Sequence, residues 1–123
     1  MKIALVTDTH FGARNDHDHF NTYFYKFYED IFFPYLKEHN IKDCIHLGDV
    51  MDRRKFVSYK TAKDFREQFC ETFVTNDINV HMIVGNHDTY FKNTNEVNSL
   101  DELIGSRYEN IKIYREAETV EFD

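Results

Sequence analysis

Three short stretches of this sequence concentrate side chains that are able to bind metal ions. Each follows an apolar run and combines carboxylates with imidazole or amide groups: Asp8-Thr9-His10, then Gly48-Asp49 with Asp52, then Gly85-Asn86-His87-Asp88. The first two patterns are common in loops, whereas a Gly-Asn-His-Asp run is rare by chance. The alternative interpretation is that Asp, Asn and Gly only form turns at strand ends. The order and placement of all three stretches favour a divalent-metal site.

The elements that must position these stretches follow from the apolar periodicity. We expect strands at 3–6, 43–47, 80–84, 111–114 and 119–122, and helices at 20–38, 60–75 and 96–104. Strands that alternate with helices predict an α/β fold with a mainly parallel sheet and right-handed crossovers. Ligands bind such sheets at the carboxyl ends of the strands. The three stretches should therefore meet along one edge of the sheet.

Both long helices show an apolar stripe. In the first, Phe20, Phe24, Phe27 and Ile31 have the spacing of one helical face. Pro34 lacks the N–H that would bond to the carbonyl four residues earlier, so we expect a kink or break there. The second helix carries the corresponding stripe, which is interpreted as core: Ala62, Phe65, Phe69 and Phe73.

Composition supports one packed, soluble domain. Hydrophobic residues make up 41% and aromatic residues 16% of the 123, which is far from the composition of disordered chains. Cys44 and Cys70 lie in a predicted strand and helix without C-x-x-C spacing, so we expect reduced core thiols. No apolar run is long enough to span a bilayer, and we expect no membrane contact and a cytoplasmic location. The net charge of −7 argues against a broad electrostatic contact with nucleic acid but leaves a local one open.

The order D-x-H, G-D, G-N-H-D resembles that of the calcineurin-like metallophosphoesterase superfamily. Within that superfamily, GDVMDRRK and VGNHDTYFKN are most similar to the nuclease subunit of double-strand-break repair complexes, of the bacterial SbcD type and the T-even-like phage type. The resemblance covers essentially the whole chain. It implies the N-terminal half of an α/β/β/α sandwich and a metal-dependent nuclease activity.

The resemblance assigns roles residue by residue. Asp8 and His10 would bind a first metal ion, Asp49 would bridge two ions, and Asn86 would bind the second. His87 would face the scissile phosphate. Carboxylate, carbonyl and imidazole ligands suit two divalent ions, with manganese preferred over magnesium, iron or zinc. Two ions about 3.5 to 4 Å apart would acidify a bridging water, and His87 would stabilise the developing charge or protonate the leaving oxygen.

Two departures from the family pattern affect these roles. Many relatives have His where this chain has Asp52, so Asp52 is expected to orient His87 by accepting its ring N–H. The family's two later motifs, a single His and a G-H-x-H, are absent from these 123 residues. Asp49 and Asn86 alone are too few ligands for tight binding of the second ion, which leaves open whether these 123 residues are active by themselves.

Basic residues lie close to the metal-binding stretches: Arg14 and His17 after the first, and Arg53, Arg54 and Lys55 after the second. The functional interpretation is contact with the DNA phosphate backbone, for which Arg provides bidentate hydrogen bonds. The alternative is a solvated charge run.

The remaining histidines are expected to lie in strands, in a solvated loop or at a helix end. His46 and His81 lie within predicted strands, where a hydrogen-bonded structural role is favoured. His19 is placed in the loop after the first strand, and His39 is expected to be a cation at the end of a helix.

The resemblance thus implies a DNA nuclease subunit that works with an SbcC-type ATPase. One alternative is a phosphatase or phosphodiesterase acting on small phosphate esters. Another is a non-catalytic relative that acts as a binding or dimerisation module. The resemblance also offers the stripe at Phe65, Phe69 and Phe73 as a dimerisation surface instead of core, because helices in this region help related nucleases to dimerise.

Half of a sandwich should leave apolar sheet surface and a strand edge uncovered. Such surfaces associate with one another, so we expect a homodimer or another form of self-association. The surfaces expected to mediate it are the open sheet face, the 119–122 edge and the Phe65/Phe69/Phe73 helix.

Overall fold

The computed structural model describes residues 1–12, 18–51, 58–83 and 108–122. Strands and helices alternate there as the sequence predicts. The elements are β1 (Ile3–Val6), α2 (Asp18–Phe27), η1 (Tyr28–Phe32), α3 (Phe33–Glu38), β2 (Asp43–His46), α4 (Tyr59–Asp64), η2 (Phe65–Cys70), α5 (Glu71–Thr75), β3 (Asn79–Ile83) and β4 (Ile111–Tyr114). The predicted helix at 96–104 lies outside the described residues.

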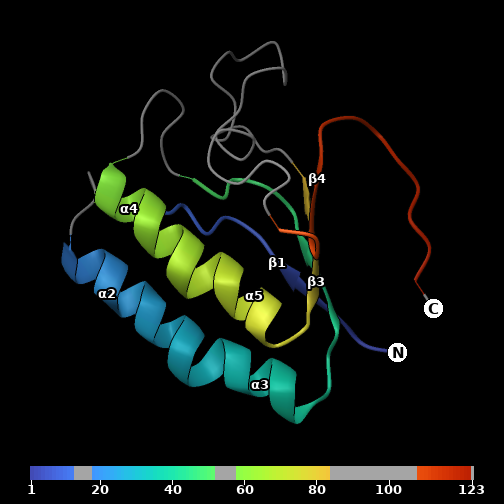
Figure 1. Ribbon diagram of the computed structural model, residues 1–123, viewed down its shortest axis with the longest axis horizontal. Coiled ribbons are helices and arrows are strands. Elements are labelled where there is room, and N and C mark those ends of the chain that lie inside the picture. The colour runs from blue at the N-terminus through green and yellow to red at the C-terminus, as the bar shows by residue number, and fades with distance from the viewer. Residues whose placement is uncertain (13–17, 52–57, 84–107, 123) are drawn as a thin grey trace.

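The four strands form one parallel sheet in the order β1-β2-β3-β4. Ile3 pairs with Asp43, and Asp43 pairs with Asn79, so the first three strands are aligned with little stagger. Two helical arms, α2–η1–α3 and α4–η2–α5, run side by side in the same direction across the sheet (Figure 1). The predicted α/β fold with a parallel sheet is confirmed.

The core lies between the sheet and these two arms. Phe65, Phe69 and Phe73 are almost completely buried, and the Phe69 ring lies 4.9 Å from Phe73 and 5.1 Å from Phe11. The interpretation of this stripe as core is therefore confirmed, and these residues are not available as a dimerisation surface. Cys44 and Cys70 are free and buried, as expected, and burial raises the pKa of the Cys44 thiol to about 12.

Both arms end in the same way and thereby return the chain to the sheet. Asn40 follows α3 with a φ of 52°, and Asp77 follows α5 with a φ of 56°. The next residue in each case donates its N–H back across the last turn, Ile41 to Leu36 and Ile78 to Phe73. These are Schellman motifs, in which a left-handed residue ends the helix and an apolar pair closes over it.

Pro34 does not break the first arm. It lies in the first turn of α3, directly after the π-helical segment η1. The Phe33 N–H bonds to the Tyr28 carbonyl, five residues earlier, and this wider turn spares the proline ring a clash with the carbonyl of Asp30. The predicted break is thus wrong, because the helical segments are continuous through Pro34.

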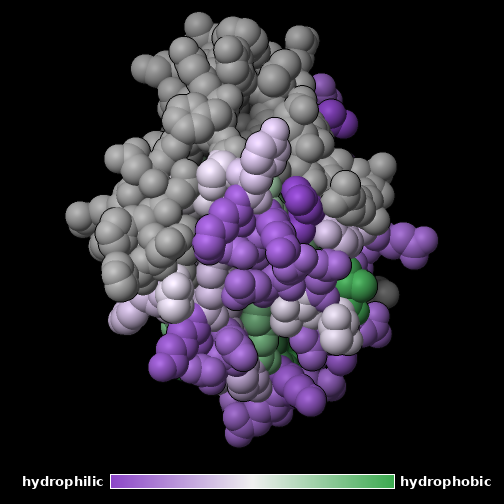
Figure 2. All heavy atoms as spheres, turned by 60° about the vertical axis from the view of Figure 1, so that its left-hand side comes forward, coloured by the Kyte–Doolittle hydropathy of each residue, from purple (hydrophilic) through white to green (hydrophobic). Residues whose placement is uncertain are grey.

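The first arm buries a different face from the apolar stripe seen in the sequence. The residues that face the core are Tyr25, Tyr28, Phe33 and Leu36. Phe24, Phe27 and Ile31 remain exposed. Seen with the N-terminal ends of α2 and α4 turned forward, most of the described surface is hydrophilic, and hydrophobic atoms show only in small areas (Figure 2).

The sheet face opposite the helices also carries exposed apolar side chains. Leu5 and Ile83 alternate with core residues of β1 and β3 and so point to that face, where Leu5 is 65% exposed.

The predicted strand at 119–122 is wrong, because these residues form no ladder. Instead, Phe122 packs edge-on against His81 with ring centres 5.1 Å apart, and His81 Nδ1 lies 2.6 Å from the Tyr114 hydroxyl. Among the described residues, none of the helices is long and apolar enough to cross a membrane.

We predict that Phe69→Ala lowers the free energy of unfolding by about 3 to 5 kcal/mol, because it leaves a cavity between both arms and the loop after β1. Urea denaturation followed by circular dichroism measures this loss. Tyr59→Ala serves as the control, because Tyr59 is 96% exposed and its removal should change stability little. Equal effects of the two substitutions would contradict this packing.

Candidate metal centre

The loops that follow β1 and β2 remain paired beyond the ends of the strands. Backbone N–H groups of Asp8, His10 and Phe11 donate to the carbonyls of Gly48, Asp49 and Val50 at 3.0, 3.0 and 2.8 Å. These bonds continue the parallel arrangement past the sheet edge. They hold the two stretches that carry Asp8, His10 and Asp49 side by side.

Buried side chains anchor both loops next to the polar ones. Phe11 directly follows His10 and packs between the arms, with its ring centre 5.0 Å from Phe65 and 5.8 Å from Tyr25. Val50 and Met51 follow Asp49 and are completely buried. The polar side chains of each loop are therefore fixed by apolar neighbours in the core, although the loops themselves reach the surface.

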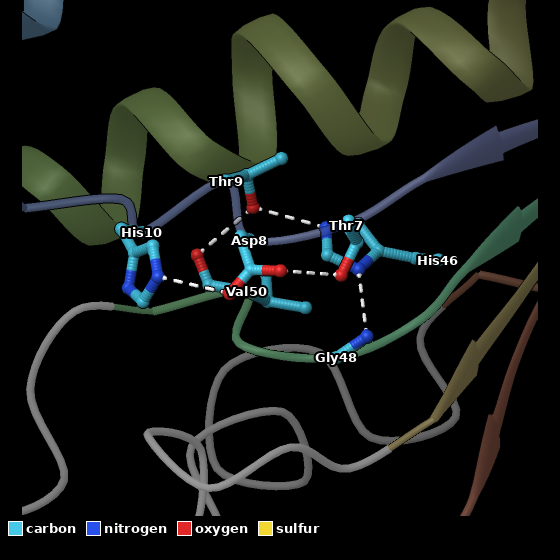
Figure 3. Close-up of polar contacts among 7 residues, drawn as sticks. All are labelled: Thr7, Asp8, Thr9, His10, His46, Gly48 and Val50. Atoms are coloured by element: carbon cyan, nitrogen blue, oxygen red, sulfur yellow. Dashed lines mark hydrogen bonds and ion pairs between the residues drawn. The ribbon is translucent and has the colours of Figure 1, made fainter.

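The paired loops bring Asp8, His10 and Asp49 together, with one potential ligand atom of each lying within 4.8 Å of the others. His10 Nε2 is 3.2 Å from Asp8 Oδ1, as the close-up shows (Figure 3). The Thr7 hydroxyl donates to the other Asp8 oxygen at 2.7 Å and holds the pKa of this carboxyl below its usual value. Asp8 is thus ionised at neutral pH, and the site combines carboxylate oxygens with imidazole nitrogen.

All three of these residues have a left-handed backbone conformation. The φ angles are 56° for Asp8, 43° for His10 and 54° for Asp49. Side chains with a Cβ pay a steric penalty in this region, and such residues cluster at functional sites. The cost is offset by the interloop hydrogen bonds and the buried anchors.

His46, the last residue of β2, is hydrogen-bonded to both loops from the core side. Its Nδ1 accepts the Gly48 N–H at 3.2 Å, so in the neutral ring the proton is on Nε2, which lies 3.0 Å from the Thr9 hydroxyl. Thr9 in turn donates to the Val50 carbonyl at 3.0 Å. This chain of hydrogen bonds joins the residue between Asp8 and His10 to the backbone on both sides of Asp49 (Figure 3).

Burial keeps His46 neutral. Its pKa is lowered to about 4, mainly because the charged ring would lose its hydration in the core. The ring therefore acts as a fixed donor and acceptor at physiological pH. The structural role that the sequence predicts for His46 is confirmed, whereas the hydrogen bond between His46 and Thr9 could not be predicted from the sequence.

Comparison with known proteins identifies the family of this chain. The family model of the calcineurin-like phosphoesterases matches residues 1–121. The chain belongs to this family. It is also 33% identical over 123 residues to exonuclease subunit 1 of Enterobacteria phage T4, and it spans about a third (35%) of that relative's length.

Calcineurin-like phosphoesterases are typically metal-dependent hydrolases, and the donor set in this member fits a divalent ion. Two carboxylates and an imidazole converge at the carboxyl ends of β1 and β2, where a parallel sheet binds ligands. The same donors suit manganese, magnesium, iron and zinc. The residues that the structure describes thus form a candidate site for a divalent ion.

Several predicted site residues lie outside the described part of this phosphoesterase chain. They are Arg14, His17, Asp52, Arg53, Arg54, Lys55, Asn86 and His87. Of the four predicted metal ligands, the structure therefore describes and brings together three, Asp8, His10 and Asp49. His19, which the sequence analysis placed in a loop, lies in α2 instead.

If Asp49 bridges two ions, Asp49→Asn should abolish two-metal binding while the chain stays folded, because Asp49 lies in a loop above the core. Titration calorimetry with Mn²⁺ measures the stoichiometry. Asp77→Asn is the matched control, since Asp77 shares the left-handed backbone but lies at the end of α5. An unchanged stoichiometry in Asp49→Asn would remove the basis for this role.

The buried neutral His46 makes stability depend on pH. Its folded pKa lies below the unfolded value near 6.5, so stability is complete above about pH 6.5 and falls as the pH drops towards 4, by roughly 3 kcal/mol. Urea titrations of the wild type and His46→Gln between pH 7 and 4 measure this. Burial also lowers the pKa of His81, which contributes to the pH dependence of both proteins. The contribution of His46 is therefore the difference between the two proteins in how steeply the free energy of unfolding changes with pH. Parallel curves would contradict a buried neutral His46.

Proposed function

We propose that this chain is the metal-binding part of a nuclease that hydrolyses phosphodiester bonds in DNA. The observation that carries the proposal is the cluster of Asp8, His10 and Asp49 at the carboxyl ends of β1 and β2. The name of the phage T4 relative, exonuclease subunit 1, supports a nucleic-acid substrate over a small phosphate ester.

Each residue of the site has a distinct part in this proposal. Asp8, His10 and Asp49 would hold a first divalent ion, and Asp49 together with Asn86 would hold a second. The bound ions, with manganese preferred, would supply an acidified water and positive charge beside the phosphate oxygens. His46 and Thr9 keep the two loops, and with them the carboxylates, at a fixed separation.

His87 and Asp52 are the residues proposed to take part in proton transfer. We propose that the His87 imidazolium stabilises the extra negative charge of the phosphorane and gives a proton to the leaving oxygen. Asp52 would accept the other ring N–H of His87 and so fix its orientation. His46 takes no part in proton transfer, because its low pKa keeps it neutral and both its ring nitrogens already have partners.

DNA would contact the chain through a local basic cluster. Arg14, His17, Arg53, Arg54 and Lys55 all lie within a few residues of the metal-binding stretches in the sequence. With a net charge of −7, the rest of the chain would repel a polyanion, so contacts confined to this cluster would place the DNA backbone at the metal ions.

The proposed partners are DNA and an SbcC-type ATPase. The printed name of the T4 relative describes it as a subunit, which supports a role within a complex. The exposed Leu5 and Ile83 on the open sheet face support self-association or cover by a further part of the protein.

Two assays run in parallel test the proposed reaction. The 123-residue chain is incubated with Mn²⁺ and either end-labelled linear duplex DNA or bis(p-nitrophenyl) phosphate. We expect Mn²⁺-dependent DNA cleavage that is lost in Asp49→Asn and retained in Asp77→Asn, although slower than at a complete two-metal site. Hydrolysis of the small ester alone would replace the nuclease with a small-substrate phosphodiesterase. Absence of both activities would leave a non-catalytic binding module and overturn the proposal.

A further inference from the structure

The two oxygens of the Asp8 carboxylate have different neighbours. Oδ1 lies 3.2 Å from His10 Nε2, and these two residues form the candidate site together with Asp49. Oδ2 accepts the Thr7 hydroxyl at 2.7 Å, which is the short distance of a hydrogen bond to a charged acceptor. Figure 3 shows the two oxygens turned towards opposite neighbours. Asp8 thus directs one oxygen at His10 and the other at Thr7.

The backbone on both sides of Thr7 is fixed by the neighbouring loop. The Leu47 N–H donates to the Val6 carbonyl at 2.8 Å, and the Asp8 N–H donates to the Gly48 carbonyl at 3.0 Å. Threonine is branched at Cβ, so its χ1 angle has few favourable values on a fixed backbone. The Thr7 hydroxyl is therefore held in one direction relative to the Asp8 carboxylate, although Thr7 is exposed.

A carboxylate fixed in this way favours one class of metal ion. Ca²⁺ takes about six to eight oxygen ligands, and carboxylates often give it both of their oxygens. Smaller ions such as Mg²⁺ and Mn²⁺ bind about six ligands in octahedral geometry, for which one oxygen from each carboxylate is enough. To supply both oxygens, the Asp8 carboxylate would have to turn and lose the hydrogen bond from Thr7.

We propose that Thr7 is a specificity-determining residue, whose hydroxyl keeps Asp8 a one-oxygen ligand and thereby favours Mn²⁺ over Ca²⁺. This role rests on the proposed metal-binding function, because it concerns the ion that Asp8, His10 and Asp49 would hold. Thr7 is not itself a ligand. It acts through the direction of the Asp8 carboxylate, so its removal should change the choice of ion and not only the strength of binding.

Thr9, on the other side of Asp8 in the sequence, has a different part. Its hydroxyl donates to the Val50 carbonyl at 3.0 Å and lies 3.0 Å from His46 Nε2. Thr9 therefore links the two loops, whereas Thr7 bonds directly to the carboxylate of a candidate ligand. Control of the ion is accordingly assigned to Thr7.

Three variants of the 123-residue chain test this role, each checked for folding by circular dichroism. Thr7→Val removes the hydroxyl and keeps the branched shape of the side chain, whereas Thr7→Ser keeps the hydroxyl. Thr72→Val is the matched control, because the exposed Thr72 hydroxyl bonds to the Gln68 carbonyl within the second helical arm. The electron paramagnetic resonance signal of free Mn²⁺ measures Mn²⁺ affinity, and displacement of bound Mn²⁺ measures Ca²⁺ affinity.

The deciding quantity is the Ca²⁺ dissociation constant divided by the Mn²⁺ dissociation constant. In Thr7→Val we expect this ratio to fall about tenfold, the size of effect that hydrogen-bond partners of metal ligands have. Thr7→Ser and Thr72→Val should keep the wild-type ratio. An unchanged ratio in Thr7→Val would overturn the proposal, and so would a wild type that binds neither ion. Weakening of both ions by the same factor would do so too, because a purely structural role gives that result.

DNA cleavage by the same preparations separates this role from the proposed nuclease activity. A wild type that binds Mn²⁺ and cuts DNA, with an unchanged ratio in Thr7→Val, would overturn the role of Thr7 alone. The expected fall in the ratio, with no DNA cleavage by the wild type, would support the role of Thr7 and overturn the nuclease.

Discussion

The site depends on the backbone pairing that continues past the ends of β1 and β2. Asp8 and His10 donate N–H groups to the loop that contains Asp49, so the separation of the candidate ligands is set by main-chain geometry. Flexible side chains alone would not hold two carboxylates together, because their charges repel. Here the hydrogen-bonded backbone of the two loops holds Asp8 and Asp49 close together. A divalent ion bound between them would offset the repulsion of the two carboxylates.

The frame is stabilised from the core side. Phe11, Val50 and Met51 are buried directly beside the ligand residues, and His46 links Thr9 to the opposite loop from below. This support explains how Asp8 and Asp49 keep left-handed backbone conformations that would otherwise be unfavourable. A substitution of the buried Phe69 is therefore expected to alter the candidate metal site as well. Phe69 contacts the ring of Phe11, and Phe11 directly follows His10 in the loop.

Much of this could be predicted from the sequence, because strands and ligand motifs depend on local patterns. The strands at Ile3–Val6 and Ile111–Tyr114, and the meeting of Asp8, His10 and Asp49, follow from apolar runs and from the rule for parallel sheets. Periodicity could not decide which face of the first arm is buried, because aromatic residues lie on both sides of it. It also could not foresee the π-helical segment before Pro34 or the hydrogen bond between His46 and Thr9, which depend on tertiary contacts.

The most direct test of the central claim is to locate a bound ion. Crystals of the chain soaked in Mn²⁺ would be measured at a wavelength where manganese scatters anomalously. The paired-loop account predicts an anomalous peak between Asp8, His10 and Asp49, within coordination distance of all three side chains. A peak elsewhere, or none at this position with the loops still paired, would contradict it.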